Sequence, residues 1–326
     1  MLEFCKKAMG RYTVNHLSVK DIGNDIYEIT LIDAAESGRS TGFFINSEEK
    51  TIVEVGASVS VPRILQALDE LQIPYDEIRY VIVTHIHLDH SGGAGLLLQS
   101  LPNAKIIVHP KGARHLIDPS KLIASAQHVY GDSFQRLFAP IEAISEERVI
   151  IAEDGMSLDI GQDRPLVFYN SPGHAYHHIV IHDPKSKGLF SGDAFGITFP
   201  LFEEMGIHYV VPTSSPTQFN PEAMAQTIER MKPLGIENIY FTHFGAWDHA
   251  DKVMDRMLTM IPIYVELAEK AYKNNPTWES IASELRNHYH TELKAMGVPD
   301  DHPYFTSLEL DTELNAKGLL HYLETR

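Results

Sequence analysis

Cysteine is nearly absent from this sequence of 326 residues, in which Cys5 is the only one. A single cysteine excludes an intramolecular disulfide. The sequence also lacks a run of about 18 apolar residues, the length that a helix needs to cross a membrane. Residues 1–10 contain neither the apolar core nor the cleavage site of an export leader. We therefore expect a cytoplasmic protein without a membrane partner.

Basic residues are few as well. The chain has 27 lysines and arginines against 44 aspartates and glutamates, which gives a net charge of −17 at pH 7. Such a surface repels nucleic acids, so the charge disfavours a nuclease and predicts no nucleic-acid partner. The hydrophobic share of 44% and the charged share of 22% are those of an ordinary globular protein with room for a large core. A small-molecule substrate that is partly apolar fits this composition best.

What the sequence does have is a dense group of candidate metal ligands in residues 84–93, THIHLDHSGG. An apolar, β-branched run at residues 78–83 precedes it and predicts a buried strand. The glycines at its end predict a tight turn into an apolar helix around residues 96–98. The candidate ligands therefore lie on a loop at the carboxyl end of a strand: His85, His87, Asp89 and His90.

Alternation along this loop decides how the four ligands meet. If the chain stays extended past Thr84, then His85, His87 and Asp89 share one face. The turn after them can bring His90 beside Asp89. This arrangement suits two adjacent metal ions better than one.

Residues 85–90 resemble the HxHxDH signature of the metallo-β-lactamase superfamily, and this resemblance implies further ligands in three later segments. His174 lies in a Pro-Gly-His turn, Asp193 in a Ser-Gly-Asp turn, and His243 directly after a predicted strand at residues 239–241. Together with residues 85–90, these segments resemble the HxHxDH signature and the later ligand positions of the metallo-β-lactamase superfamily. The resemblance extends over about the first 250 residues.

The resemblance implies an α+β fold, the αββα sandwich of that superfamily, with a C-terminal helical extension. We expect a catalytic domain over residues 1–250 and an accessory helical region over residues 251–326. Helical periodicity at residues 253–273, 278–290 and 308–323 supports the second part. This region can cover the pocket, form a homodimer interface or cap the core, and the sequence does not rank the three.

The ligand roles of the family carry over residue by residue. They assign His85, His87 and His174 to one metal ion, Asp89, His90 and His243 to a second, and Asp193 to a bridge between the two. Family members usually have an aspartate at the position of Glu54, where it supports the metal loop from behind. The two ions implied are divalent, and zinc, iron and manganese all accept nitrogen and oxygen ligands.

A dinuclear site of this family implies hydrolysis by a hydroxide that bridges the two metals. Asp89 can pass a proton to the leaving group, and Tyr176 is a candidate hydrogen-bond donor to the oxyanion. We predict a metal-dependent hydrolase acting on a small ester, thioester or lactone. Because no cysteine ligand and no export signal is present, the natural substrate is not expected to be a β-lactam. A glyoxalase II would need a basic patch in the carboxy-terminal region to hold glutathione, and none is evident.

A function of another class stays open. Residues 190–196, FSGDAFG, look like the corresponding segment of flavodiiron proteins, which predicts a diiron oxygen-binding or redox protein. Two features oppose this interpretation: flavodiiron proteins typically have a glutamate at the position of His87, and the chain contains no flavodoxin domain. A member of the family that only binds is disfavoured, because every ligand is present.

Several aromatic residues have two interpretations. A helical excursion at residues 122–137 contains Tyr130, which either touches the substrate or packs on the core. The loop at residues 195–220 either walls an apolar pocket or fills the core with its large side chains: Phe199, Phe202, Tyr209 and Phe219.

Three histidines close to the ligands in sequence are not expected to bind metal. His178 is predicted to support the ligands from behind. His109 and His115 are predicted to be structural, because the ligand set is complete without them.

Overall fold

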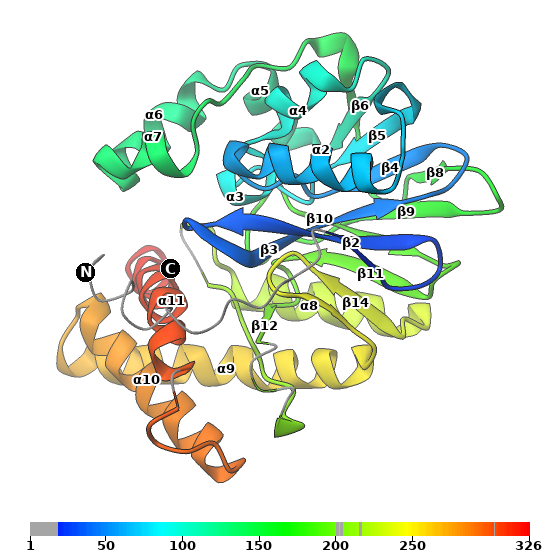
Figure 1. Cartoon of the computed structure of the whole chain (residues 1–326). Helices are drawn as coiled ribbons and strands as arrows, with labels where there is room; N and C mark the ends of the chain where they lie inside the picture. The colour runs from blue at the N-terminus through cyan, green and yellow to red at the C-terminus, as the bar shows by residue number, and fades with distance from the viewer. Residues whose placement is uncertain (1–18, 200–201, 203–204, 215–216, 303) are drawn as a thin grey trace.

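The computed structural model describes residues 19–199, 202, 205–214, 217–302 and 304–326. Cys5 and residues 1–10, on which the predictions about disulfides and an export leader depend, lie outside the described residues. Two sheets face each other and helices cover both outer faces, so that four layers stack in the order helix, sheet, sheet, helix (Figure 1). The predicted α+β fold with an αββα sandwich is confirmed.

The first sheet has seven strands, in the order β1-β2-β3-β4-β5-β6-β7. Its first four strands pair antiparallel, and β4 to β7 run parallel. The strands are β1 (Val19–Asp21), β2 (Ile26–Asp33), β3 (Glu36–Ile45), β4 (Lys50–Val53), β5 (Ile78–Ile82), β6 (Lys105–Val108) and β7 (Val149–Ile151).

The second sheet has six strands, in the order β15-β14-β11-β10-β9-β8. All of its pairs are antiparallel except β11 with β14. The strands are β8 (Ser157–Asp159), β9 (Pro165–Asn170), β10 (Ile179–Asp183), β11 (Gly188–Gly192), β14 (Asn238–Phe241) and β15 (Gly245–Trp247), and a separate two-stranded sheet pairs β12 (Ile197–Thr198) with β13 (Val210–Val211).

Alternation of apolar side chains explains why the two sheets stack. Neighbouring residues of one strand point to opposite faces, so a strand buried on both sides is apolar throughout. In β3, Phe43 packs between the sheets whereas Phe44 packs under the first helical layer. In β11, Phe190 packs between the sheets and Leu189 packs under the second helical layer.

The observed helices agree with the helical patterns of the sequence. Asn220 begins α8 by accepting a hydrogen bond from the backbone N–H of Ala223 at 2.9 Å. The predicted excursion at residues 122–137 forms two helices, α6 and α7. The helices are α2 (Val61–Glu70), α3 (Leu88–Ser91), α4 (Ala94–Ser100), α5 (Pro110–Ile117), α6 (Ser120–Tyr130), α7 (Phe134–Leu137), α8 (Pro221–Met231), α9 (Ala250–Asn274), α10 (Trp278–Ala295) and α11 (Tyr304–Thr325).

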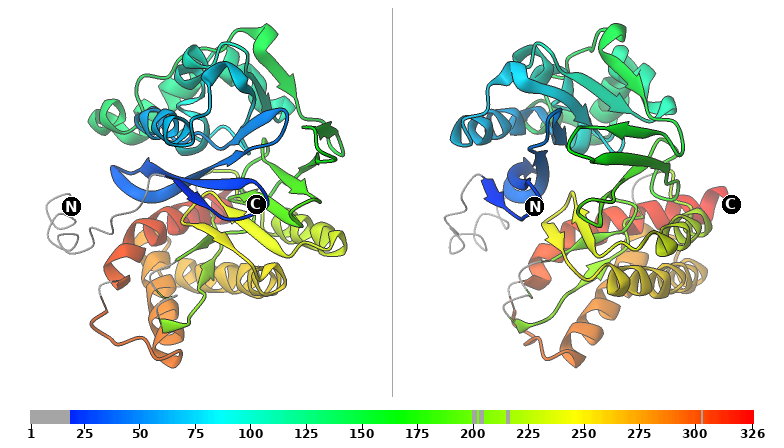
Figure 2. Two further views of the ribbon diagram at one scale, coloured as in Figure 1. Left: turned by 45° about the vertical axis from the view of Figure 1, so that its right-hand side comes forward. Right: turned by 90° about the vertical axis from the view of Figure 1, so that its right-hand side faces the viewer.

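The C-terminal helices share a core with the second sheet. Met257 of α9 and Leu285 of α10 lie in the same buried cluster as Ile239 of β14. Figure 2 shows α11, in red, beside the blue hairpin of β2 and β3. Among the helices that the structure describes, none is both long and apolar enough to span a bilayer.

Candidate metal centre

The metal loop follows β5 at the edge where parallel strands of the first sheet end. The chain is extended at His87, with φ −62° and ψ 148°, and α3 begins at Leu88. Asp89 and His90 therefore lie in the first turn of a helix and not on an extended segment. The prediction of an extended chain as far as Asp89 is wrong, because helix α3 begins one residue earlier, at Leu88. The helical turn brings the side chains of Asp89 and His90 towards the other ligands.

Gly92 and Gly93 form the turn between α3 and α4, and glycines are needed there for packing. Gly92 and Gly93 have φ values of −58° and −81°, which any residue adopts. A Cβ on Gly93 would lie 2.9 Å from Cγ2 of Val61, and one on Gly95 would lie 2.0 Å from the carbonyl oxygen of Glu142. The predicted turn into the apolar helix is confirmed, and close approach of other segments explains why glycines occupy it.

Three imidazoles converge at the first half of the site. Nδ1 of His87 lies 2.9 Å from Nε2 of His85 and 3.0 Å from Nε2 of His174. His85 and His174 are buried, and His87 is half-buried. His174 comes from the turn after β9, in which Gly173 has φ +140°, and a Cβ on this glycine would lie 2.5 Å from the backbone of Met224 in α8.

Two imidazoles and a carboxylate form the second half. Oδ2 of Asp89 lies 3.6 Å from Nε2 of His90 and 3.6 Å from Nε2 of His243. His243 follows β14, and the backbone N–H of Thr41 in β3 donates to the carbonyl of Thr242 at 2.7 Å. This hydrogen bond joins the two sheets at the site.

Asp193 spans the two halves. Its Oδ2 lies 3.3 Å from Nε2 of His174. Its Oδ1 lies 3.3 Å from Nε2 of His90 and 3.5 Å from Nε2 of His243. The structure thus brings together all seven residues predicted as ligands, with Asp193 between the two groups.

Hydrogen bonds at Nδ1 orient the rings of His174 and His243 so that Nε2 of each faces the site. The hydroxyl of Thr213 donates to the carbonyl of Asp193 at 2.8 Å, so its oxygen accepts from Nδ1 of His174 at 3.1 Å. Nδ1 of His243 donates to the carbonyl of Arg39 at 3.3 Å. A ring that donates from Nδ1 keeps the lone pair on Nε2 for a metal ion.

Glu54 supports the second half from behind. Its carboxylate accepts hydrogen bonds from Nδ1 of His90, from the backbone N–H of Thr84 at 2.6 Å and from the hydroxyl of Thr242 at 3.0 Å. The residue has φ +66°, a left-handed conformation that is strained for any residue with a side chain. The longer side chain that departs from the usual aspartate therefore reaches the metal loop and the His243 loop at once.

His178 supports Asp193 and is not one of the convergent ligands. Its Nε2 accepts a hydrogen bond from the backbone N–H of Asp193 at 3.1 Å, and its Nδ1 donates to the hydroxyl of Ser171 at 2.6 Å. This position agrees with the supporting role expected from the sequence.

The donor set fits divalent cations. Nε2 of His90 and Oδ1 of Asp193 are buried and lack a hydrogen-bond partner among the described residues. Burial and the neighbouring imidazoles lower the pKa of His85 well below its usual value of 6.5. Burial also acts to lower the pKa of His90, but the carboxylates of Asp193, Asp89 and Glu54 raise it to about 10. The same surplus of negative charge favours a metal ion in place of the proton.

The two predicted tyrosines lie outside this buried group. Tyr176 is 52% exposed, and Nζ of Lys111 lies 5.6 Å from the centre of its ring. Tyr130 is 40% exposed, and its ring packs edge to face on Phe138 with the two ring centres 4.8 Å apart. Burial and the charge of Asp89 raise the pKa of Tyr130. A catalytic role for Tyr176 stays a prediction.

The remaining sequence-based candidates are structural. Nδ1 of His109 accepts a hydrogen bond from the backbone N–H of Lys111 at 3.0 Å and so begins α5. His115 accepts from Arg114 at 3.1 Å. The aromatic residues of the long loop are buried in the core with α8, α9 and α10: Phe199, Phe202, Tyr209 and Phe219. Of the two interpretations, core packing is therefore correct, and the wall of an open pocket is wrong.

Apart from Glu54 and His178, sequence reasoning missed the residues that orient the ligands. Thr213 is 39 residues from His174, and Thr242 is 188 residues from Glu54. Arg39 contributes a backbone carbonyl, which any residue has. No local pattern marks such residues, because their roles depend on distant segments meeting.

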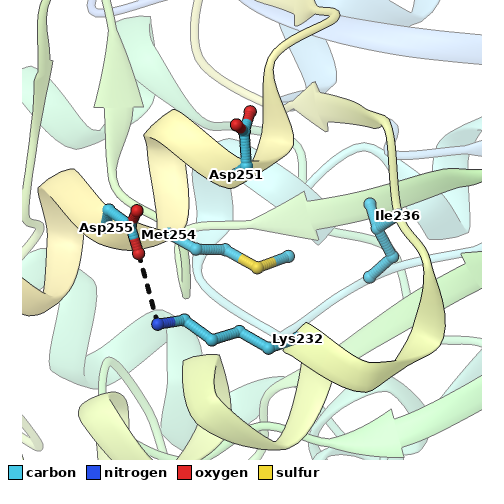
Figure 3. Close-up of a pocket in the computed structure, with 5 residues that line it drawn as sticks. All are labelled: Lys232, Ile236, Asp251, Met254 and Asp255. Carbon is cyan, nitrogen blue, oxygen red and sulfur yellow. Dashed lines mark hydrogen bonds and ion pairs between the residues drawn. The ribbon is translucent and has the colours of Figure 1, made fainter.

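A hollow between α9 and the segment after α8 lies apart from the metal centre (Figure 3). Nζ of Lys232 forms an ion pair with Asp255 at 3.2 Å across it. None of the residues that line it is a candidate ligand: Lys232, Ile236, Asp251, Met254 and Asp255. We assign no substrate to this hollow.

Comparison with known proteins agrees with the geometry. A family model of the metallo-beta-lactamase superfamily matches residues 36–243. The chain is 30% identical over 173 residues to a metallo-beta-lactamase fold-containing protein of Sulfurisphaera tokodaii, an alignment that covers 52% of this chain and 62% of that protein. It is 27% identical over 172 residues to the acyl-coenzyme A thioesterase MBLAC2 of Homo sapiens, with coverage of 48% and 59%.

A redox protein is also among the relatives. The anaerobic nitric oxide reductase flavorubredoxin of Aliivibrio salmonicida is 26% identical over 192 residues, which are 55% of this chain and 32% of that protein. All three alignments span less than two thirds of the relative.

The structural comparison covers nearly the whole chain. The crystal structure of a beta-lactamase domain protein from Burkholderia ambifaria matches with a TM-score of 0.64 over 95% of this chain and 91% of that chain, at 16% identity. The range of the family model contains every candidate ligand, from His85 to His243. This chain therefore belongs to the metallo-beta-lactamase superfamily.

Proposed function

We propose that the protein is a metal-dependent hydrolase that uses two divalent ions on a small ester, thioester or lactone. The observation that carries this proposal is the position of Asp193. One of its oxygens faces the nitrogen of His174 and the other faces those of His90 and His243. A carboxylate placed in this way suits a bridge between two cations.

Divalent ions held by these residues would lower the pKa of a bound water to about 7 and polarise the carbonyl of the substrate. The side chains of the protein then have separate tasks. Asp89, whose side chain is 30% exposed, lies on the accessible side of the ligands and can carry a proton to the leaving group. Tyr176, exposed at the rim, is the candidate donor to the oxyanion.

The ions and the acyl substrate are the finer part of the proposal. Three imidazoles in one half, and two imidazoles with carboxylates in the other, suit zinc best, and they also accept iron or manganese. The relative named as an acyl-coenzyme A thioesterase supports thioesters as the first substrates to test.

The alternative is a diiron redox protein, and the flavorubredoxin relative keeps it in the test. No contact in the site favours it over hydrolysis. Nδ1 of His87 approaches two other imidazole nitrogens, so the residue that departs from the flavodiiron pattern occupies a ligand position.

Elemental analysis of protein purified under anaerobic conditions, with absorption spectra before and after exposure to air, separates the two functions. We expect about two zinc or manganese ions per chain, no visible band, and turnover of a compound in a panel of esters, thioesters and lactones. Two irons with a band that responds to oxygen, and no turnover in the panel, would reject the hydrolase.

A further inference from the structure

Positive charge in this acidic chain gathers beside the metal centre. Residues 105–140 contain five lysines and arginines and two aspartates, whereas the whole chain has a net charge of −17. In the part of the chain that the structure describes, the four basic residues after β6 form no ion pair: Lys111, Arg114, Lys121 and Arg136. Many other surface lysines and arginines are paired, among them Lys187 with Glu237. Unpaired charge is available to a ligand.

The first turn of α5 packs against residues that adjoin the ligands. A Cβ on Gly112 would lie 2.8 Å from Cγ2 of Ile86, which lies between the first two histidines of the metal loop, and 3.9 Å from Cβ of His177. The ring of His177 in turn lies 5.5 Å from the ring of His87. Gly112 allows this close contact, which fixes α5 at the side of the half-buried ligand His87.

Lys111, in the first turn of α5, is exposed and lies beside Tyr176. Its Nζ lies 5.6 Å from the centre of the Tyr176 ring, and Tyr176 is only two residues after the ligand His174. Contact with the aromatic face holds the ammonium group near the accessible side of the site while leaving it in solvent. The carboxylates of the site, Asp89 and Asp193, are themselves candidate ligands and would be neutralised by cations.

We propose that Lys111, held over Tyr176, binds an anionic group carried by the thiol or alcohol part of the substrate. The group is a phosphate or a carboxylate, and the substrate is an anionic ester or thioester. This inference rests on the proposed hydrolase function. Lys111 would supply a positive charge at the site, in a protein whose net negative charge otherwise repels anionic substrates.

The test uses three thioether analogues that carry the same acyl group and cannot be hydrolysed. One has a coenzyme A tail with phosphates, one a glutathione tail with carboxylates, and one an uncharged N-acetylcysteamine tail. Calorimetry measures their dissociation constants with the intact protein, and kcat/KM for the matching thioesters gives the same comparison in turnover.

The variants are Lys111→Glu, Lys111→Ala and the control Lys105→Glu. Lys105 is exposed in the same segment but begins β6, at the end opposite to the ligands. We expect wild-type protein to prefer an anionic tail over the neutral tail at least about tenfold, Lys111→Glu to lower that ratio about tenfold, and Lys105→Glu to leave it unchanged. A preference for the coenzyme A tail assigns phosphate, and one for the glutathione tail assigns carboxylate.

Equal binding of all three analogues by wild-type protein would overturn the inference. So would equal effects of Lys111→Glu and Lys105→Glu on the ratio, since these would reflect net charge alone. Thermal unfolding shows whether each variant is folded. Because the analogues need no turnover, a preference that depends on Lys111 in a protein without hydrolase activity would reject the proposed function and still support the anionic ligand.

Discussion

The guanidinium of Arg39 forms a buried ion pair with Asp311 of α11. The backbone carbonyl of Arg39 accepts the hydrogen bond from Nδ1 of His243. Asn315, on the same helix, forms a hydrogen bond with Ser214. Thr213, which directly precedes Ser214, orients the ring of His174. The C-terminal helix thus supports ligands of both halves of the site, although it contributes none.

Asn315→Ala tests this support. The side chain of Asn315 accepts from the backbone N–H of Ser214 at 2.7 Å and donates to the carbonyl of Pro212 at 3.1 Å, and all three residues are buried. Removal leaves two buried backbone groups without partners, so we expect a loss of about 3 kcal/mol in the free energy of unfolding. Urea unfolding measures it. Asn287→Ala, on the exposed face of α10, should change stability by less than about 0.5 kcal/mol, and equal losses would reject the special role of Asn315.

Glu54→Gln removes the charge that holds His90. The carboxylate of Glu54 accepts hydrogen bonds from His90, Thr84 and Thr242 with its two oxygens. The glutamine amide has only one oxygen, and its NH₂ group donates, so it cannot accept all three. Loss of such a supporting partner lowers metal affinity by about 10–100-fold. Competition with a chelator measures the affinity. Glu229→Gln, on the exposed side of α8, is the control, and an unchanged affinity in Glu54→Gln would show that the carboxylate does not orient the ligand.

The sequence predicted the ligands well because four of them form one local motif and the family resemblance implied the other three. Four of them lie within six positions after one strand, and the other three follow strands in short turns with glycine. Strand ends that meet at one edge of a sandwich bring such turns together. Every one of the seven side chains is part of a convergent group in the structure.

The resemblance indicated Glu54 and His178 as supports of the ligands, but the other supporting contacts were beyond the sequence because they are not local. Asp311 is 272 residues from Arg39. The aromatic loop shows a different limit: an apolar side chain such as Phe202 suits a pocket wall and a core equally. Only the position of α9 and α10 over it decides for the core.

His87→Ala removes the shared contact of the first three imidazoles. Its nitrogen lies within 3.0 Å of those of His85 and His174, so two ligands and Asp193 remain for the first ion. We expect metal content to fall from about two ions to about one per chain, with hydrolysis lowered at least about 100-fold. Elemental analysis and turnover measure both. His249→Ala, a partly exposed histidine away from the ligands, should keep both values. A variant at His87 that stays active with both metals would remove this residue from the ligand set.

Glu292 gives a dependence of stability on pH away from the metals. Burial acts to raise its pKa, but the hydrogen bonds and charge of Arg256, with the hydroxyl of Tyr209, hold the pKa below 4.5. A lowered pKa in the folded state stabilises the protein above the unfolded value of about 4.3, and this stability is lost as the pH falls towards the folded value.

We therefore expect Glu292→Gln to cost about 2 kcal/mol at pH 7. The difference from wild-type protein should shrink below about pH 4.3. Urea unfolding across this range measures it. Glu266→Gln, exposed on α9, should show no such trend. A constant difference between pH 7 and pH 3 would show that the charge of Glu292 does not contribute.

Gly192 connects the backbone of the site to its metal ligands, because it directly precedes Asp193. It has φ +50°, and an added Cβ would lie 2.5 Å from Nε2 of His178 and 2.6 Å from the hydroxyl of Thr84. Gly235 has φ +68° and open space around it. Both alanine variants therefore meet the same backbone strain, and only one of them meets a clash.

We expect Gly235→Ala to lower the free energy of unfolding by about 1 kcal/mol. Gly192→Ala should lower it by about 3 kcal/mol, because overpacking adds to the strain. The clash also displaces His178, whose ring accepts a hydrogen bond from the backbone N–H of Asp193, so metal affinity should fall in this variant alone. Urea unfolding and chelator competition measure the two effects. Equal stability losses in the two variants, with unchanged metal affinity, would show that the neighbouring side chains move to accept a Cβ at position 192. The backbone at Gly192 would then not fix the position of Asp193.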